Sequence, residues 1–172
     1  MKKRVVTIVV ALLWAAPGFA QSTESEGDEG HWSIGAGMGF TASPETFLMN
    51  FEAEYHFTDH LSVGPALHVG VASGGTIVSP FANVRYRFGP LPFDNDFLKK
   101  FRPHIQGGLG LTYYSFGPGD TGMLLNFGGG LEYMVSDDFA LGSRMLFNVL
   151  PVDAGGDNFY WSWEIIGARI RF

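Results

Sequence analysis

Two short histidine and serine pairs are the residues whose spacing first suggests chemistry. His31 and Ser33 stand two apart in "HWS", and His60 and Ser62 stand two apart in "HLS". A histidine within hydrogen-bond reach of a serine can act as the general base for a nucleophile when an acidic group orients its ring. Both pairs lie at the ends of alternating segments, and His60 falls in a turn.

The acidic residues that could complete such a site lie elsewhere. Glu164 and Glu52 fall toward the opposite ends of their segments, and His68 is the histidine nearest to them. A general base without a nucleophile in reach does not make a catalytic site. The sequence therefore predicts no catalytic residues and a protein that is not an enzyme.

Motifs for metals and cofactors are weak as well. His31, His56 and His104 could approach a metal ion at one rim, but satisfied interior histidines are several times more common. The glycines of "GAGMGF" repeat at every second residue without a following helix, unlike the G-x-G-x-x-G loop that binds dinucleotides. Cysteine is absent, so thiolate ligands are excluded. We expect no metal and no cofactor.

The glycine-rich motif belongs to the first of eight segments in which apolar residues recur with a period of two. The segments cover residues 31–40, 47–57, 61–71, 76–88, 102–114, 122–134, 139–148 and 160–172. Most approach the roughly 9–11 residues that a tilted strand needs to cross a bilayer. An even number of strands joined as hairpins can close without a free edge. The pattern predicts an all-β fold, an eight-stranded antiparallel up-and-down transmembrane β-barrel.

The residues before the first segment divide into two parts. "MKKR", an apolar run and "PGFA" predict a signal peptide over residues 1–20, with an anchoring helix as the alternative. Removing these residues changes the formal charge from -6 to -9, which disfavours nucleic-acid binding. The stretch "QSTESEGDEG" predicts an acidic flexible leader over residues 21–30. Residues 31–172 are then predicted to form the barrel domain.

Alternation alone does not say which face of a barrel points outward. A soluble lipocalin-like barrel would carry many Lys and Glu on its outer face, but after residue 20 the lysines are limited to Lys99 and Lys100. Aromatic rings favour the headgroup level of a membrane. Two such bands are expected, formed by Trp32, Tyr55, Phe57, Tyr86, Phe88, Tyr133, Phe139 and Phe172 at one end, and by Tyr113, Phe159, Tyr160, Trp161 and Trp163 at the other. We therefore expect the apolar face to contact lipid.

These features together resemble a known family. The signal peptide, the alternating strands and the motifs "RYRF", "GGLGL", "GGGLEY" and "RIRF" resemble small outer-membrane β-barrel proteins of the OmpA-transmembrane-domain and OmpX type, over residues 31–172. The resemblance implies a Gram-negative cell outer membrane as the location, contact with outer-membrane lipid and lipopolysaccharide, and both termini in the periplasm. We also expect a monomer.

The family also implies a role for the last strand. Its members end in an aromatic residue that the barrel-assembly machinery recognises, which implies an assembly signal at Phe172 and Ile170. Simple anchoring of Phe172 at the membrane interface is the alternative. Either role requires the last strand to close against the first.

The connection over residues 89–101, "GPLPFDNDFLKKF", is the longest on the periplasmic side. Asp94 or Asn95 could cap a short helix whose apolar stripe includes Phe93 and Phe97, with both lysines facing outward. Such a segment could anchor the rim in the membrane interface. Alternatively, it could dock a periplasmic partner.

Charged residues on the polar face gather toward the periplasmic end. Unpaired charges in so narrow a lumen would be costly, so they should form Arg and Glu pairs that block the passage. The predicted ionic plug comprises Glu54, Arg85, Arg87, Arg102, His104, Glu132, Arg144, Glu164, Arg169 and Arg171.

The register of the hairpins sets which charges meet. Pairing of Asn148 with Tyr160 would place Arg144 opposite Glu164, and a tight third hairpin would place His104 opposite Glu132. Glu164 and Arg169 differ in parity, although both should face inward. A β-bulge is therefore predicted between them, at Ile166 or Gly167.

Three functions fit this sequence. We expect an integral outer-membrane barrel with an envelope-structural or interaction role, closed and non-conducting. The first alternative is a porin-like narrow channel or a barrel that binds a small solute, in which some arginines reach periplasmic water and leave a thin pore. The second is a lipid A-modifying enzyme.

Overall fold

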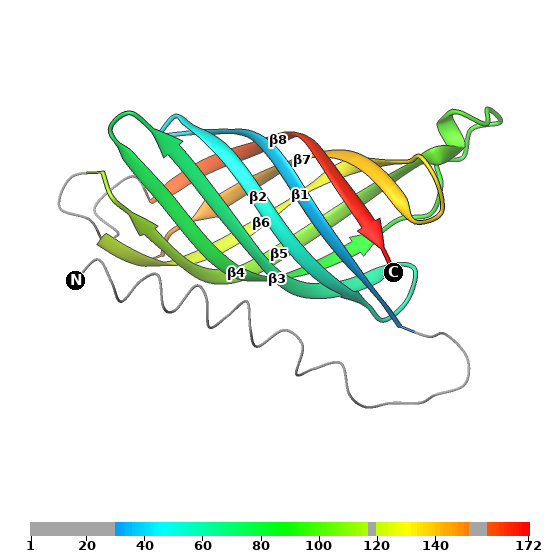
Figure 1. The fold of residues 1–172 in the computed structure, drawn as a ribbon, viewed down its shortest axis with the longest axis horizontal. Helices are drawn as coiled ribbons and strands as arrows, with labels where there is room; N and C mark the ends of the chain where they lie inside the picture. Colours follow the sequence, from blue (N-terminus) through cyan, green and yellow to red (C-terminus); the bar gives the residue numbers. More distant parts are fainter. Residues whose placement is uncertain (1–29, 117–119, 152–157) are drawn as a thin grey trace.

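The computed structural model of the protein describes residues 30–116, 120–151 and 158–172. The described residues form a closed antiparallel barrel in which sequence neighbours pair and β1 also pairs with β8 (Figure 1). Its strands are β1 (His31–Ala42), β2 (Thr46–His56), β3 (Leu61–Ala72), β4 (Gly75–Arg87), β5 (Phe101–Tyr114), β6 (Asp120–Met134), β7 (Phe139–Val149) and β8 (Phe159–Arg171). The predicted all-β up-and-down barrel is confirmed.

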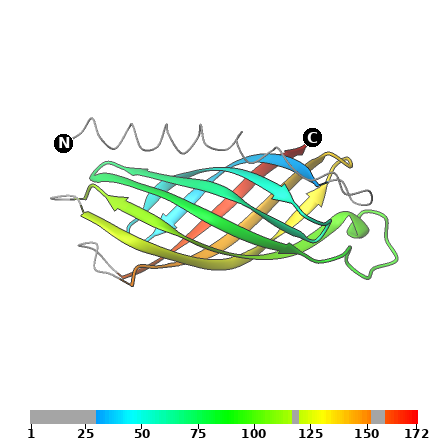
Figure 2. The same cartoon turned by 90° about the horizontal axis from the view of Figure 1, so that it is seen from below.

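The connections alternate between the two ends of the barrel. We call one the terminus end, because β1 begins and β8 ends there, together with the connections at 57–60, 88–100 and 135–138 (Figures 1 and 2). The other is the loop end, where β1 meets β2, β3 meets β4, β5 meets β6 and β7 meets β8. No helix within the described ranges is long and apolar enough to span a membrane.

The alternation of side chains gives the barrel two different surfaces. Large apolar residues such as Ile34, Ile105 and Phe127 are each more than half exposed on the outer wall. Polar residues of opposite parity, such as Asn50 and Arg85, are buried in the lumen. The apolar face therefore points outward, as predicted, and the lumen is narrow enough for side chains to fill it.

A β-bulge interrupts β8, as the parity of Glu164 and Arg169 predicted. Met38 of β1 pairs with Ile166, whereas the next residue of β1 pairs with Glu164. The extra residue is therefore Ile165, slightly nearer to the loop end than predicted. Both Ile165 and Ile166 are about half exposed on the outer wall, so the residues on either side of the bulge can face the lumen.

One predicted register is wrong. Asn148 pairs with Tyr160 and Arg144 with Glu164, as expected, but Glu132 lies opposite Arg102 instead of His104. The third hairpin pairs Tyr114 with Asp120, which shifts β5 against β6 by two residues. A two-residue shift keeps every side chain on its own face, so the error changes a partner without changing the lumen's composition.

Aromatic rings cluster on the outer wall near both ends. At the terminus end, the ring of Tyr55 lies 5.4 Å from Trp32 and 5.1 Å from Phe57. At the loop end, Phe40 lies 5.5 Å from Trp161 and 5.6 Å from Trp163. The prediction for Tyr160 is wrong: it is 1% exposed and faces the lumen, because its parity is opposite to that of its aromatic neighbours.

The connection between β4 and β5 contains a short 3-10 helix, η2 (Leu98–Lys100). The side-chain oxygen of Asn95 accepts backbone N–H groups from Phe97 and Leu98, at 2.9 and 3.3 Å. The predicted short helical segment is therefore present. Asn95 binds the backbone just before it, whereas the N-cap position is Phe97, whose side chain makes no capping hydrogen bond. With three residues, η2 is shorter than one turn of an α-helix. It is therefore too short to form the predicted apolar stripe.

Candidate functional site

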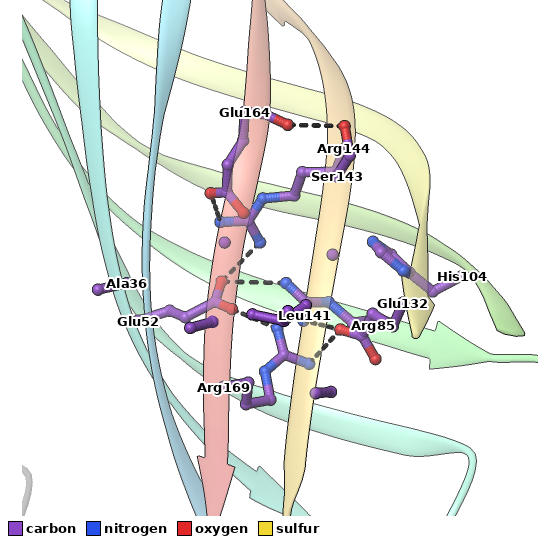
Figure 3. A pocket seen from close by; sticks show the side chains of 14 residues that line it. Ala36, Glu52, Arg85, His104, Glu132, Leu141, Ser143, Arg144, Glu164 and Arg169 are labelled. Carbon is purple, nitrogen blue, oxygen red and sulfur yellow. Dashed lines mark hydrogen bonds and ion pairs between the residues drawn. The ribbon is translucent and has the colours of Figure 1, made fainter. Parts of the chain in front are cut away.

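The lumen toward the terminus end holds a group of charged side chains that contact one another. We call it the lumen ionic cluster, and it comprises Glu52, Glu54, Arg85, Arg87, Glu132, Arg144, Glu164 and Arg169. They come from five strands, β2, β4, β6, β7 and β8. Figure 3 shows how they meet across the lumen, apart from Glu54 and Arg87, which it does not draw. Strand alternation places all of them inward, because each has the lumen parity of its strand.

Arg85 is at the centre of this cluster. Its guanidinium group lies 3.0 Å from Glu52, 3.3 Å from Glu54 and 3.2 Å from Glu132. It also donates a hydrogen bond of 3.1 Å from Nε to Gln106. The side chain is fully buried, so protein atoms replace its contacts with water.

Arg87 and Arg169 extend the cluster toward the terminus end. Arg87 lies 3.0 Å from both Glu54 and Glu132. Arg169 lies 2.6 Å from Glu132 and 3.6 Å from Glu54, and it also pairs with Glu52. Each of these three carboxylates therefore contacts more than one guanidinium group.

Arg144 extends the cluster toward the loop end. Its Nη1 donates to Glu52 at 2.6 Å and to Gln106 at 3.2 Å, and its Nη2 donates to Glu164 at 2.8 Å. Glu164 thus reaches the cluster through Arg144 (Figure 3). This contact confirms the pair that the predicted register of the last hairpin brought together.

The charges of the lumen ionic cluster balance. Its four carboxylates face four guanidinium groups, and each of these side chains is at most 10% exposed. Buried charges are tolerated when they are paired and hydrogen-bonded. A cavity of about 20 Å³ remains beside them, which is space for about one water molecule. The cluster therefore fills this part of the lumen.

Two glycines make room for Glu164. A Cβ atom built on Gly37 or on Gly167 would collide with the carboxylate of Glu164. Glycine at these two positions of β1 and β8 therefore lets the carboxylate lie against the wall and reach Arg144.

The structure changes the membership of the predicted plug. Glu54, Arg85, Arg87, Glu132, Arg144, Glu164 and Arg169 come together as described above. Arg102 and Arg171 are half-buried nearer the terminus end and form no ion pair with the described residues. Both ring nitrogens of His104 lack a hydrogen-bond partner among these residues. His104 lines the small cavity next to Glu132, so it borders the cluster without pairing in it.

Glu52 is the residue that the predicted plug lacked. It contacts Arg85, Arg144 and Arg169, and thereby joins the two ends of the cluster. The signal was present in the sequence, because Glu52 has the same parity as Glu54 on the same strand. From the sequence, Glu52 was a candidate solely as an acidic group for catalysis.

A second group packs in the lumen toward the loop end. Its members are apolar, and buried hydrogen-bonded side chains such as Ser79 and Thr112 lie in the same half of the lumen. We call the apolar group the loop-end apolar cluster, formed by Ala66, Ile77, Phe81, Tyr114, Leu124, Leu150 and Tyr160, with Phe116 packed against them. The rings of Tyr114 and Tyr160 lie 6.2 Å apart, edge to face. Leu124 is fully buried, and Tyr160 is 1% exposed. This cluster was not predicted from the sequence.

Ser33 and His56 form a buried serine and histidine contact, at 2.8 Å between Oγ and Nε2. The other ring nitrogen of His56 lies 2.9 Å from Nη1 of Arg87. Because a guanidinium group only donates, Nδ1 of His56 accepts, and Nε2 carries the proton that it donates to Ser33. This tautomer cannot take a proton from Ser33, so the contact does not activate a nucleophile.

The three histidines considered as metal ligands do not converge on one point. The rings of His31 and His56 stack at 4.3 Å, whereas His104 lies beside the cavity near Glu132. Within the described ranges, no group of three or more histidine or acidic side chains is arranged to hold a metal ion.

Comparisons with known proteins support the fold. No family model and no curated protein matches the chain. Among solved structures, Neisserial surface protein A (NspA) has a TM-score of 0.63 at 17% identity, over 83% of this chain and 97% of that one. The N-terminal β-barrel domain of Pseudomonas aeruginosa OprF has a TM-score of 0.61 at 17% identity, over 84% and 100%. The outer membrane enzyme PagL has a TM-score of 0.51 at 14% identity, over 80% and 98%.

These identities establish a shared architecture and nothing finer. The chain has the fold of small eight-stranded transmembrane barrels. Because proteins with different roles share this fold, its function has to be argued from the lumen and the surfaces.

Proposed function

We propose that the protein is an integral outer-membrane β-barrel with an envelope-structural or interaction role and a closed lumen. The observation that carries the proposal is the lumen ionic cluster, whose paired charges fill the interior beneath a strongly apolar outer wall. An apolar wall with aromatic bands suits lipid contact, and a filled lumen suits a scaffold better than a conduit. The cell outer membrane, with its lipid and lipopolysaccharide, is the proposed location.

A narrow channel or small-solute barrel has less support. Water crossing the barrel would have to pass both the lumen ionic cluster and the loop-end apolar cluster. The cavity beside the charges holds about 20 Å³, which is too small for a solute larger than water.

The proposal assigns no catalytic role to the barrel. The tautomer of His56 opposes activation of Ser33. The carboxylate of Glu164, the acidic candidate toward the loop end, is committed to Arg144. A lipid A-modifying activity would therefore need residues beyond those that the described geometry brings together, and mass analysis of lipid A on overexpression tests for it directly.

The terminal strand supports a role in assembly. The backbone of Phe172 exchanges hydrogen bonds with Trp32, at 3.1 and 2.9 Å, so the last residue helps to close the barrel against β1. The side chains of Phe172 and Ile170 are 70% and 51% exposed on the outer face. This exposure makes them accessible to the barrel-assembly machinery, as we propose. The described strands close within one chain, which supports a monomer.

Two measurements test this proposal. Heat-modifiable gel mobility in the outer-membrane fraction is expected, because a folded barrel resists detergent until it is heated; recovery in the soluble periplasm would overturn the location. Single-channel recordings of refolded protein should show no steady conductance. An open current in the unmodified protein would overturn the closed lumen.

A further inference from the structure

An aromatic and basic surface lies outside the lumen, where β5 and β6 reach the terminus end. We call it the β5–β6 rim and define it by Phe93, Phe97, Lys100, Phe101 and Tyr133. We propose that this rim binds the phosphate group of a phospholipid in the adjoining leaflet, with Lys100 as the contact. The proposal rests on the membrane location proposed above.

The connection folds back onto the barrel wall at this rim. The ring of Phe97 lies 5.4 Å from Phe101 and 5.4 Å from Tyr133, and these two rings lie 5.1 Å apart. Phe101 and Tyr133 are also paired in the β5–β6 ladder. Phe97 therefore extends the aromatic surface of the outer wall beyond the last paired residues.

The backbone holds this arrangement in place. The side-chain oxygen of Asn95 accepts hydrogen bonds from the backbone N–H groups of Phe97 and Leu98. Its backbone carbonyl oxygen accepts a hydrogen bond of 2.9 Å from the N–H of Lys99. The carbonyl of Phe97 accepts the N–H of Lys100 at 3.3 Å. Phe97 and Lys100 are thus presented by one hydrogen-bonded turn.

The rim exposes apolar area that an aqueous setting would disfavour. Phe97 is 58% exposed and Phe93 is 49% exposed. Exposed aromatic side chains on one short connection mark a surface that contacts something apolar. Because Phe97 continues the outer wall, the same lipid that covers the wall can cover the rim.

The two lysines of the connection have different partners. Lys99 pairs with Asp94 at 3.2 Å. Lys100 places Nζ 5.9 Å from the centre of the Tyr133 ring. Among the described residues, Lys100 has no ion-pair partner. A cation held beside an aromatic band lies at the level of lipid phosphates. Lys100 is therefore the group available to a phosphate.

A periplasmic protein is the other partner that this connection could bind. Lipid is favoured because the rim is continuous with the outer wall and carries a cation at its border. A protein partner would instead leave Phe93 and Phe97 in water until it bound, and the first experiment distinguishes these cases.

The first experiment measures where the rim lies. The chain has no cysteine, so single nitroxide labels can be attached at Phe93→Cys, at Ile105→Cys on the outer wall and at Ser136→Cys in another terminus-end turn. The refolded full barrel is placed in nanodiscs of phosphatidylethanolamine and phosphatidylglycerol. Collision rates with oxygen and with a water-soluble nickel chelate then report the depth of each label.

We expect the label at 93 to collide more often with oxygen than with the nickel chelate, as the label at 105 does. The label at 136 should collide more often with the nickel chelate. A label at 93 that matches 136 overturns the lipid proposal and leaves the rim to a protein partner. If the label at 105 also favours nickel, the proposed membrane location itself fails. The two failures are therefore distinguishable.

The second experiment assigns the phosphate contact. Native mass spectrometry of the folded barrel measures how much added phosphatidylglycerol it retains. We expect Lys100→Gln to lower retention about fivefold, which is the usual weight of one basic residue near anionic lipid. Lys99→Gln, its matched control, should retain lipid as the unmodified protein does. Full retention in Lys100→Gln, or an equal loss in Lys99→Gln, would overturn the assignment.

Discussion

The two halves of the lumen differ in their chemistry, because ion pairs dominate one and an apolar cluster lies among hydrogen-bonded polar side chains in the other. Toward the terminus end, Arg85 and Glu52 belong to a network of paired charges with almost no exposure. Toward the loop end, Leu124 and Tyr160 belong to a cluster of aliphatic and aromatic side chains that is equally buried. A narrow barrel can therefore close its interior in either way, and the two ways respond differently to the loss of one side chain.

The difference lies in what a missing group leaves behind. Removing one carboxylate from the lumen ionic cluster leaves buried guanidinium groups without compensation. Removing a side chain from the loop-end apolar cluster leaves an apolar cavity, which stays dry when it is small. The ionic half should therefore be more sensitive to mutation, and the apolar half should keep the lumen closed when the ionic half is disturbed.

The largest expected effect is on conduction. Because the two clusters lie in series, we expect Glu52→Ala combined with Leu124→Ala to give a steady single-channel current, whereas either change alone stays close to silent. Protein from the heat-modifiable folded band should be used, so that misfolded material does not contribute. A current as large in Glu52→Ala alone would show that the apolar cluster does not close the lumen.

The next effect is on stability. Glu52→Ala should lower the free energy of unfolding by about 3–5 kcal/mol, because Arg85, Arg144 and Arg169 each lose a partner. Urea unfolding of the refolded barrel in lipid, followed by gel mobility, measures this loss. Glu45→Ala is the control: Glu45 is exposed in the connection before β2, and the change should stay within about 0.5 kcal/mol. Equal losses in the two variants would contradict the importance of the cluster.

A substitution in the loop-end apolar cluster should lower the free energy of unfolding somewhat less. Leu124→Ala is expected to cost about 3 kcal/mol through the cavity it leaves among Ile77, Phe81 and Tyr160. The neighbouring Leu125 has the opposite parity and is 38% exposed, so Leu125→Ala provides a matched control with a smaller loss. The same urea titration compares them, and a larger loss in Leu125→Ala would show that the lumen packing contributes little.

The smallest effect concerns the space that the ionic half needs. Gly167→Ala should displace Glu164 and weaken its contact with Arg144, at a cost of about 1–2 kcal/mol. Gly107 is the control, because a Cβ there meets its nearest atom at 3.5 Å, an ordinary contact distance. Its alanine variant should leave the midpoint of urea unfolding almost unchanged. If both variants unfold alike, the space beside Glu164 is not needed.

Much of this architecture could be predicted from the sequence because alternation is a strong pattern. Each predicted strand overlaps an observed one, and the last hairpin has the expected pairing of Asn148 with Tyr160. The parity of Glu164 and Arg169 was sufficient to predict the bulge. The third hairpin was misjudged because alternation fixes the face of a residue such as His104, but leaves its partner free by steps of two.

The interior was harder to predict than the wall. Lumen residues were predicted mainly from their polarity. This criterion identified the charged residues, but it placed Tyr160 on the outer wall and missed the loop-end apolar cluster. Leu124 and Phe81 have the lumen parity of their strands, so parity alone would have placed them inside. The convergence of three arginines on Glu52 depends on how β2, β4, β7 and β8 are placed around the barrel axis, and no local pattern contains that information.

The bulge at Ile165 sets which residues of the rest of β8 face lipid and which face the lumen. Every residue after it, including Arg169 and the exposed Phe172, owes its side of the wall to one extra residue. A deletion of Ile165 would reverse the alternation of every residue that follows it: Arg169 would turn toward lipid and Phe172 toward the lumen. We therefore expect related chains to tolerate substitutions at this position far more readily than a change in length, and to gain or lose residues together with a compensating change in β1 or β7.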